Sequence, residues 1–415
     1  VAEWWRTRVP ELVRTMPYTE RIQFWKVHNE FGYHSAGLFD YSPGSIERYH
    51  EWLGGRYAKL GDLNAAWRTQ FTIVDEIAPP RTRDEMIKCL GNWLEWRRFT
   101  CWNFADYFRT TGNLIRSVQP GAAVSDNFYT TDPLQGWDNF ELARQADYLA
   151  YDIYSAGRWP GLLEKLEQAR SAASAWGKPF IIMEYHAGPN NWNSQVTYRD
   201  LTIEAATALS RECRALQWFR WIPDSAGREQ GIHGMMDSRG RPTERFTAAA
   251  ETSAFCQRLA PLLVRSRTVS ETALLTGSDA SYLAYAKGGG TWESRQRWDR
   301  FSSVLAKAGI QCDQINPKVV TDGDISRYAV VIAGHLPVLG TDVLKRLYAF
   351  ADAGGTVIMH PDVGLLDAYG QPRGDDPYTD EAVADGPWQA RKRRDGATGI
   401  VVQWMCNVYI VYCPW

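Results

Sequence analysis

Short, continuous runs of apolar residues alternate with longer amphipathic stretches along the first part of the chain. Continuous apolar runs are typical of strands that are buried on both faces, and the stretches between them have the periodicity of helices. Strands that each lead into a helix predict a parallel α/β sheet. The predicted strands are 22–28, 122–125, 148–153, 180–183 and 216–221, and the main predicted helices are 2–16, 84–119, 162–176 and 198–214.

The pattern changes character after residue 265. Three further apolar runs, separated by amphipathic stretches, indicate a second and smaller α/β domain. Its predicted strands are 272–276, 328–333 and 356–360, and its predicted helices are 292–309 and 341–353. After residue 370 the chain is polar and bears Gly and Pro, and it becomes apolar again at 400–415. The sequence therefore predicts three parts, which are a first domain over 1–265, a second over 266–370 and an unassigned tail over 371–415.

Polar residues lie at the carboxyl end of every predicted strand of the first domain. Because the carboxyl ends of parallel strands meet at one edge of a sheet, these side chains are expected to share one rim. Such a rim favours a (β/α)8 TIM-type barrel over an open sheet, although only five strands are recognised. The rim residues are Asn29, Glu30, Asp126, Asn127, Asp152, Tyr154, Glu184, His186, Arg220 and Asp224.

Glu30 and Glu184 are the two glutamates of this rim. Paired carboxyl groups are the usual equipment for cleaving a glycosidic bond, since one protonates the leaving oxygen while the other attacks the anomeric carbon or holds a water molecule. Asn29 is placed to hydrogen-bond a sugar hydroxyl beside the reacting carbon. Either glutamate alone has a simpler interpretation as a solvated or salt-bridged side chain. The hypothesis therefore depends on both lying at matching strand ends.

Composition and charge exclude several classes of protein. A formal net charge of −2 provides no field for binding nucleic acid or an anionic membrane, and no apolar run reaches the length of a transmembrane helix. The seven cysteines contain no CxxC pair, and no ligand set surrounds His28, His34 and His186, so we expect no metal and no cofactor. The absence of a visible signal peptide predicts a cytoplasmic location. The 19 Trp residues are equally consistent with core packing, interfaces and stacking on sugar rings, so their number does not decide among these roles.

Several longer motifs are more specific than single residues. They include HNEFG at 28–32, FIIMEYHAGPNNW at 180–192 and QWFRWIPDSAGREQGIHGMMD at 217–237, together with the insertion WLGGRYAKLGDLNAAWRTQF at 52–71. These motifs resemble the glycoside hydrolases of clan A, and more narrowly the family 42 β-galactosidases. CDQINP and AVVIAGHLPVL in the second domain resemble that family's flavodoxin-like trimerisation domain. The resemblance covers about residues 15–365. It implies that the chain begins in the helix before the barrel's fourth strand and that the first strands of the barrel are lacking.

The resemblance implies a role for each matching residue. Glu30 would be the general acid/base, and Glu184 the nucleophile, of a retaining mechanism. Trp192 would stack on a sugar ring, and Glu229 and His233 would bind galactose hydroxyls. Ring packing for Trp192 and a core or surface position for His233 are the simpler alternatives. The other predicted substrate-binding residues are Asn29, Asn127, Tyr154 and Phe219, and Arg220 lies in the matching motif of the last strand.

The implied function is a retaining, exo-acting β-glycosidase, specifically a β-galactosidase, that acts on a β-galactoside or a related oligosaccharide. β-Glucosidase and α-L-arabinopyranosidase specificities, and a non-catalytic sugar-binding protein, remain alternatives. The trimerisation-type domain implies a homotrimer. Four apolar residues of the second domain's predicted helices either pack on a neighbouring subunit or cover their own sheet, namely Leu305, Leu344, Leu347 and Phe350.

Overall fold

The computed structural model describes residues 2–30, 39–128, 133–154, 162–188, 197–289, 301–360 and 362–373, together with the backbone of three strands between residues 378 and 404. The chain forms two compact units. The first consists of Val1–His34 and Cys101–Val269, and the second of Ser35–Thr100 and Ser270–Trp415. The limits of the three parts predicted above stay a prediction.

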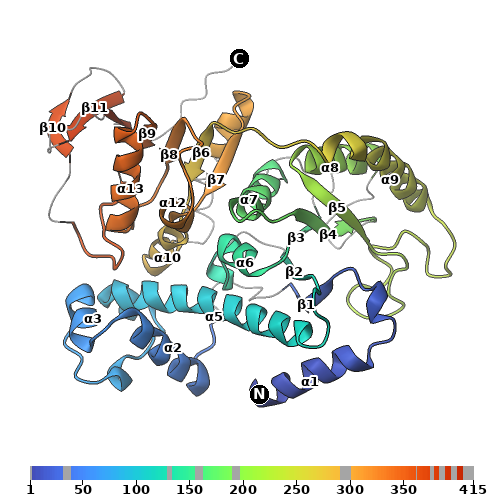
Figure 1. The fold of residues 1–415 in the computed structure, drawn as a ribbon, viewed down its shortest axis with the longest axis horizontal. Helices are drawn as coiled ribbons and strands as arrows, with labels where there is room; N and C mark the ends of the chain where they lie inside the picture. The colour runs from blue at the N-terminus through green and yellow to red at the C-terminus, as the bar shows by residue number, and fades with distance from the viewer. Residues whose placement is uncertain are drawn as a thin grey trace. The chain divides into compact units, whose positions relative to one another are not determined.

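The first unit contains a five-stranded sheet in which every neighbouring pair is parallel (Figure 1). The strands lie in chain order. All residues of the three central strands are buried, as their continuous apolar runs predicted, whereas the first and last strands are partly exposed. The strands are β1 Trp25–Asn29, β2 Val124–Phe128, β3 Leu149–Ile153, β4 Phe180–His186 and β5 Cys213–Phe219.

The predicted parallel α/β class is confirmed for this sheet. Within the described part of the chain, β1 and β5 are its edge strands. Closure into a (β/α)8 barrel therefore stays a prediction.

Helices of the first unit form an apolar core with the sheet. Val9 and Val13 pack with Phe108, Ile115 and Val124 in one buried cluster. The helices are α1 Ala2–Thr15, the C-terminal part of α5 Leu90–Arg116, α6 Asn139–Gln145, α7 Leu162–Ala175, α8 Tyr198–Ser210 and α9 Glu244–Leu263, with short 3-10 helices at Thr19–Arg21 and Pro133–Gln135. No helix in the described ranges is both long and apolar enough to cross a membrane.

The single helix predicted over 84–119 is two helices in the structure, α4 Arg83–Lys88 and α5. Thr82 caps α4 by accepting a hydrogen bond from the Glu85 N–H. Cys89 lies between the two helices with φ −140° and ψ 80°, outside the helical region. The break was not predicted because Cys89 is neither Gly nor Pro, and the apolar period continues through it.

The second unit contains a seven-stranded sheet with the order β10-β11-β12-β9-β8-β6-β7. The neighbours from β12 to β7 are parallel, whereas β11 pairs antiparallel with both β10 and β12. The three strands after residue 370 thus extend the sheet, although the polar sequence of β10 and β11 indicated no strand and the apolar run from residue 400 was left unassigned. The strands are β6 Thr272–Leu275, β7 Cys312–Ile315, β8 Val330–Ala333, β9 Thr356–Met359, β10 Tyr378–Ala382, β11 Trp388–Arg393 and β12 Ile400–Trp404.

Helices and aromatic rings complete the second unit. Trp96 is buried and its ring centroid lies 5.0 Å from that of Tyr49 and 5.3 Å from that of Phe99. Part of the high aromatic content therefore serves the core. The labelled helices are α2 Pro43–Arg56, α3 Leu60–Trp67, α4, the N-terminal part of α5, α10 Ser278–Ala286, α12 Pro317–Asp322 and α13 Thr341–Asp352, with a 3-10 helix at Val74–Glu76.

Helix α13 lies beside β9 (Figure 1) and decides between two alternatives raised by the sequence. Leu344, Leu347 and Phe350 are all buried within the second unit, while Leu305 is half-buried. Because the three α13 residues recur on one helix face, that face covers the chain's own sheet. The expectation that these three residues pack on a neighbouring subunit is wrong.

Replacing Leu347 with Ala is expected to destabilise the second unit by about 2–5 kcal/mol, since a fully buried leucine leaves a cavity when it is truncated. Urea unfolding followed by circular dichroism measures the change. The exposed neighbour Lys345→Ala serves as the control and is expected to change the free energy of unfolding by less than about 0.5 kcal/mol. Equal effects of the two substitutions would contradict the burial of this face.

Candidate active site

The carboxyl ends of four adjacent strands bring three carboxylates together in the first unit. Glu30 directly follows β1, Asp152 lies in β3, and Glu184 lies in β4. Their side chains each offer a carboxylate oxygen within 4.8 Å of the others, and we call them the acidic cluster. The parallel register explains the meeting, because it pairs Asp152 directly with Glu184.

Asn127, at the end of β2, connects the acidic cluster. Its Nδ2 lies 2.7 Å from Asp152 Oδ2, 2.7 Å from Glu184 Oε1 and 3.4 Å from Asn29 Oδ1. Its Oδ1 accepts a hydrogen bond of 3.1 Å from the Glu30 N–H. The side-chain amide has two hydrogens, so the two short contacts to carboxylates use them, and the contact to Asn29 is the weakest. Asn127 therefore positions the carboxylates of β3 and β4 and the backbone that carries Glu30.

Two further donors hold Glu184. The Tyr154 hydroxyl donates a 2.6 Å hydrogen bond to Oε2, and Lys26 Nζ lies 3.5 Å from Oε1. With Asn127, these donors contact both carboxylate oxygens, which is the environment of an acceptor-only, ionised group. Burial, and then the Glu184 charge, raises the pKa of Tyr154, so its hydroxyl keeps its proton and remains a donor.

Glu30 has the electrostatic environment of an acid at neutral pH. Burial and, next, the negative charge of Glu184 raise its pKa from an ordinary 4.5 to about 7, against the opposing charge of Lys26. Its backbone has φ 45°, in the left-handed region that only a few per cent of residues other than Gly adopt. A carboxyl group with such a raised pKa is suited to donate a proton at neutral pH.

The other acidic groups near the site favour protonation. Burial, followed by the Glu184 charge, raises the pKa of Asp152 well above its usual range. Burial also raises the pKa of Asp126 to about 6, although its Oδ1 accepts a 3.1 Å hydrogen bond from the His28 N–H. Three carboxylates are oxygen ligands of the kind that bind hard cations. The Lys26 ammonium beside Glu184 opposes a cation there, so we assign no metal to the acidic cluster.

The end of β5 and the loop after it contribute the remaining predicted residues. The His233 ring lies 5.4 Å from Tyr154 and 5.3 Å from Phe219, between centroids. Burial mainly lowers the pKa of His233, so the imidazole is neutral. Arg220 forms ion pairs with Glu229 and, at 2.6 Å, with Asp224. The Arg220 N–H also donates to the His233 carbonyl over 2.8 Å, which fixes the loop against the strand end.

The predicted site residues therefore divide into two groups. Tyr154 connects the group around the acidic cluster with the group at the end of β5, because its hydroxyl donates to Glu184 and its ring lies 5.4 Å from that of His233. Trp192 lies outside the described residues. Two members of the site were missing from the predicted set, namely Asp152, which the rim pattern contained, and Lys26, whose only signal was a charge inside an apolar strand.

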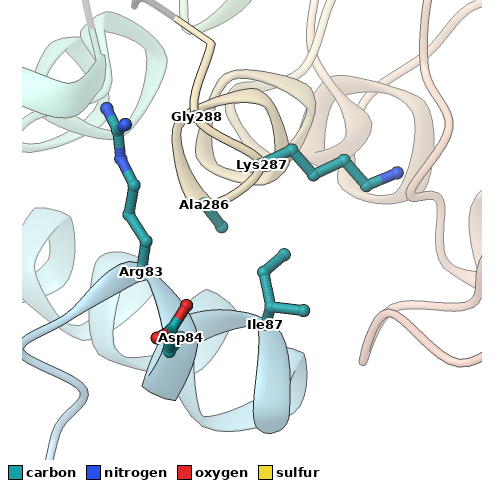
Figure 2. Close-up of a pocket in the computed structure, with 6 residues that line it drawn as sticks. All are labelled: Arg83, Asp84, Ile87, Ala286, Lys287 and Gly288. Carbon is teal, nitrogen blue, oxygen red and sulfur yellow. The ribbon is translucent and has the colours of Figure 1, made fainter.

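The second unit carries a pocket of about 470 Å³ that shares no residue with the acidic cluster. In Figure 2 the charged ends of Arg83 and Lys287 extend in different directions, with Asp84 and Ile87 on the helix below. No convergent set of polar groups points to one ligand there. We assign no function to this pocket.

Comparison with known proteins relates both parts of the chain to β-galactosidases. A family model described as β-galactosidase matches residues 5–259, and one described as β-galactosidase trimerisation domain matches residues 271–375. The chain is 26% identical over 360 residues to a β-galactosidase of Arthrobacter sp, covering 83% of this chain and 50% of that protein. It is also 26% identical over 401 residues to β-galactosidase BgaH of Haloferax lucentense, covering 88% and 56%.

The fold is similar to that of solved β-galactosidases. The crystal structure from Rahnella sp. R3 superposes with a TM-score of 0.79 at 19% identity, covering 97% of this chain and 68% of that one. The chain spans about half the length of the relatives that it matches in sequence. Because the family model covers more than half of its 415 residues, the chain belongs to the β-galactosidase family of glycoside hydrolases, family 42.

Proposed function

We propose that the chain carries the catalytic site of a retaining, exo-acting β-glycosidase that hydrolyses terminal β-D-galactosides. One observation carries the proposal: Glu30 and Glu184 offer carboxylate oxygens within 4.8 Å of each other. Retaining glycosidases place their two carboxyl groups about 5–5.5 Å apart, whereas inverting enzymes need roughly 6.5–9.5 Å to admit a water molecule. The short separation favours retention.

In the first step a Glu184 oxygen attacks the anomeric carbon. The bond from that carbon to the leaving oxygen breaks, and the electron pair stays on the leaving oxygen, which takes the proton of Glu30. The raised pKa of Glu30, about 7, keeps this proton available at neutral pH. Tyr154, Asn127 and Lys26 hold the attacking carboxylate in place through the contacts described above.

In the second step water attacks the same carbon and breaks its bond to Glu184, and Glu30 accepts the water proton. Formation of the glycosyl ester removes the negative charge of Glu184, which is a major cause of the raised pKa of Glu30. The charge of Lys26 remains, so the pKa of Glu30 falls and the group can act as a base. One residue thus serves as acid and then as base.

The substrate assignment rests on the names of the relatives and on the predicted contact residues. Asn29, Asn127, Tyr154, Phe219, Trp192, Glu229 and His233 are proposed to contact the sugar. β-Glucosidase and α-L-arabinopyranosidase activities, and a non-catalytic sugar-binding role, are less favoured. We also propose that the protein forms a homotrimer, which the match to a trimerisation domain supports. Its proposed location is the cytoplasm.

The stereochemistry of hydrolysis tests this proposal. We expect the chain to cleave a nitrophenyl β-D-galactoside faster than the matching β-glucoside and α-L-arabinopyranoside, and to release β-galactose first in a proton NMR time course. Release of α-galactose first would show inversion, and a higher kcat/KM on another glycoside would change the assigned sugar. If the chain hydrolyses none of these glycosides faster than buffer alone does, the result would favour the non-catalytic sugar-binding role.

A further inference from the structure

Two imidazoles and one carboxylate form a second cluster at the carboxyl ends of β8 and β9. His360 Nδ1 lies 2.6 Å from Asp362 Oδ1, and His335 Nδ1 contacts Asp362 Oδ2. Each of the three side chains offers a ligand atom within 4.8 Å of the others. The two imidazole centroids are 6.2 Å apart, with ring planes at 86°. We call His335, His360 and Asp362 the histidine cluster. It lies in the second unit and is independent of the proposed catalysis.

Backbone hydrogen bonds hold the two segments that carry this cluster. The His360 N–H donates to the Ala333 carbonyl over 2.9 Å, and the Gly364 N–H donates to the Leu336 carbonyl over 2.9 Å. These bonds continue the parallel register in which Ala333 pairs with Met359. The three side chains are therefore placed by the sheet and its extension, and the cluster is preorganised before any ligand arrives.

The environment of the histidine cluster suits a cation. The side chains of His335, His360 and Asp362 keep exposures of 17%, 20% and 19%, so they are mostly covered yet open to a small ion. A carboxylate with two imidazoles is a donor set for transition metals.

We propose that His335, His360 and Asp362 bind a divalent transition-metal ion, with Zn²⁺ as the best match. Imidazole nitrogen favours Zn²⁺ and its neighbours over Mg²⁺ and Ca²⁺, which prefer oxygen alone. Three protein ligands leave a fourth tetrahedral position for water or another donor. With metal–ligand bonds of about 2.0–2.2 Å, the donor atoms of a tetrahedral site lie roughly 3.3 Å apart. The Asp362 carboxylate would therefore move slightly away from the two imidazole nitrogens when the ion binds. The ion would then tie the segment after β8 to the segment after β9.

Metal titration of the whole chain tests this proposal. After chelator treatment and dialysis, we expect the chain to take up one Co²⁺ with the visible absorption of a tetrahedral site, and Zn²⁺ to displace it. His335→Ala and His360→Ala should each weaken Zn²⁺ binding more than about tenfold in a competition with a chromogenic chelator. Asp362→Asn, which keeps the shape of the side chain, should weaken binding in the same direction.

Two control variants locate the ion. His50 of the same unit lies 3.7 Å from Asp75 without a second imidazole at that contact, so His50→Gln should bind Zn²⁺ as the wild type does. Glu184→Gln, in the acidic cluster, should also leave Zn²⁺ affinity unchanged. Circular dichroism checks that each variant is folded. A wild type that takes up no metal, or folded histidine-cluster variants that bind it as tightly as the wild type, would overturn the proposal.

Discussion

Glu184→Gln is expected to lower kcat on a β-galactoside by roughly 10⁴-fold or more, because an amide cannot attack the anomeric carbon. The substitution keeps the size of the side chain, so it removes the nucleophile with little change in packing. It also replaces one carboxylate oxygen with a donor that faces other donors on Tyr154, Asn127 and Lys26. Initial rates on a nitrophenyl β-galactoside measure the loss.

A matched control separates catalysis from folding. Glu244, at the exposed start of α9, is a glutamate of the same unit outside the site, and Glu244→Gln should retain the wild-type rate. Thermal unfolding of both variants shows whether either has lost structure. A folded Glu184→Gln variant within tenfold of the wild-type kcat would refute the assignment of Glu184 as nucleophile.

Glu30→Gln is expected to slow hydrolysis of substrates with poor leaving groups by about 10²–10⁴-fold, since proton donation to the leaving oxygen is lost. A dinitrophenyl galactoside needs little protonation, so its first step should survive and the galactosyl ester should accumulate. Azide, which needs no general base, should then attack the ester and yield β-galactosyl azide. An equal loss of activity on the dinitrophenyl galactoside and on a galactoside with a poor leaving group, with no azide product, would contradict the acid/base role of Glu30.

The pH dependence of kcat/KM gives the same residue a second signature. Glu30 must be protonated in the first step, and its pKa is raised from an ordinary 4.5 to about 7. Activity should therefore fall as the pH rises through about 7, because Glu30 then loses the proton that it donates. This alkaline limb should vanish in Glu30→Gln. It should persist in Asp126→Asn, which removes the neighbouring carboxyl whose pKa is about 6.

The meeting of Glu30 and Glu184 was predictable because it follows from strand order. Continuous apolar runs identified five parallel strands, and parallel strands place their carboxyl ends at one edge. The organisation within that edge was not predictable. Asn127 was predicted to contact the sugar, but the sequence did not indicate that its amide also donates hydrogen bonds to Asp152 and Glu184. Which donor meets which acceptor depends on side-chain rotamers, and these are not encoded in a hydrophobic pattern.

The second unit shows a related limit. The sequence pointed to His28, His34 and His186 as the only candidate metal ligands and predicted no metal, whereas the histidine cluster follows the carboxyl ends of β8 and β9 in the other unit. His335 and His360 are far apart along the chain and become neighbours only through strand pairing. Strands β10 and β11 were not predicted because their sequences are polar, and they join the sheet through antiparallel pairing with each other and with β12.

The left-handed backbone of Glu30 has a consequence for engineering this chain. Gly adopts that conformation without the steric cost that a side chain carries, so selection for thermal resistance alone would favour a glycine there. The same change would delete the proton donor. Mutant libraries designed to increase stability should therefore keep Glu30 unchanged, because the residue that best stabilises the fold at this position differs from the residue that catalysis requires.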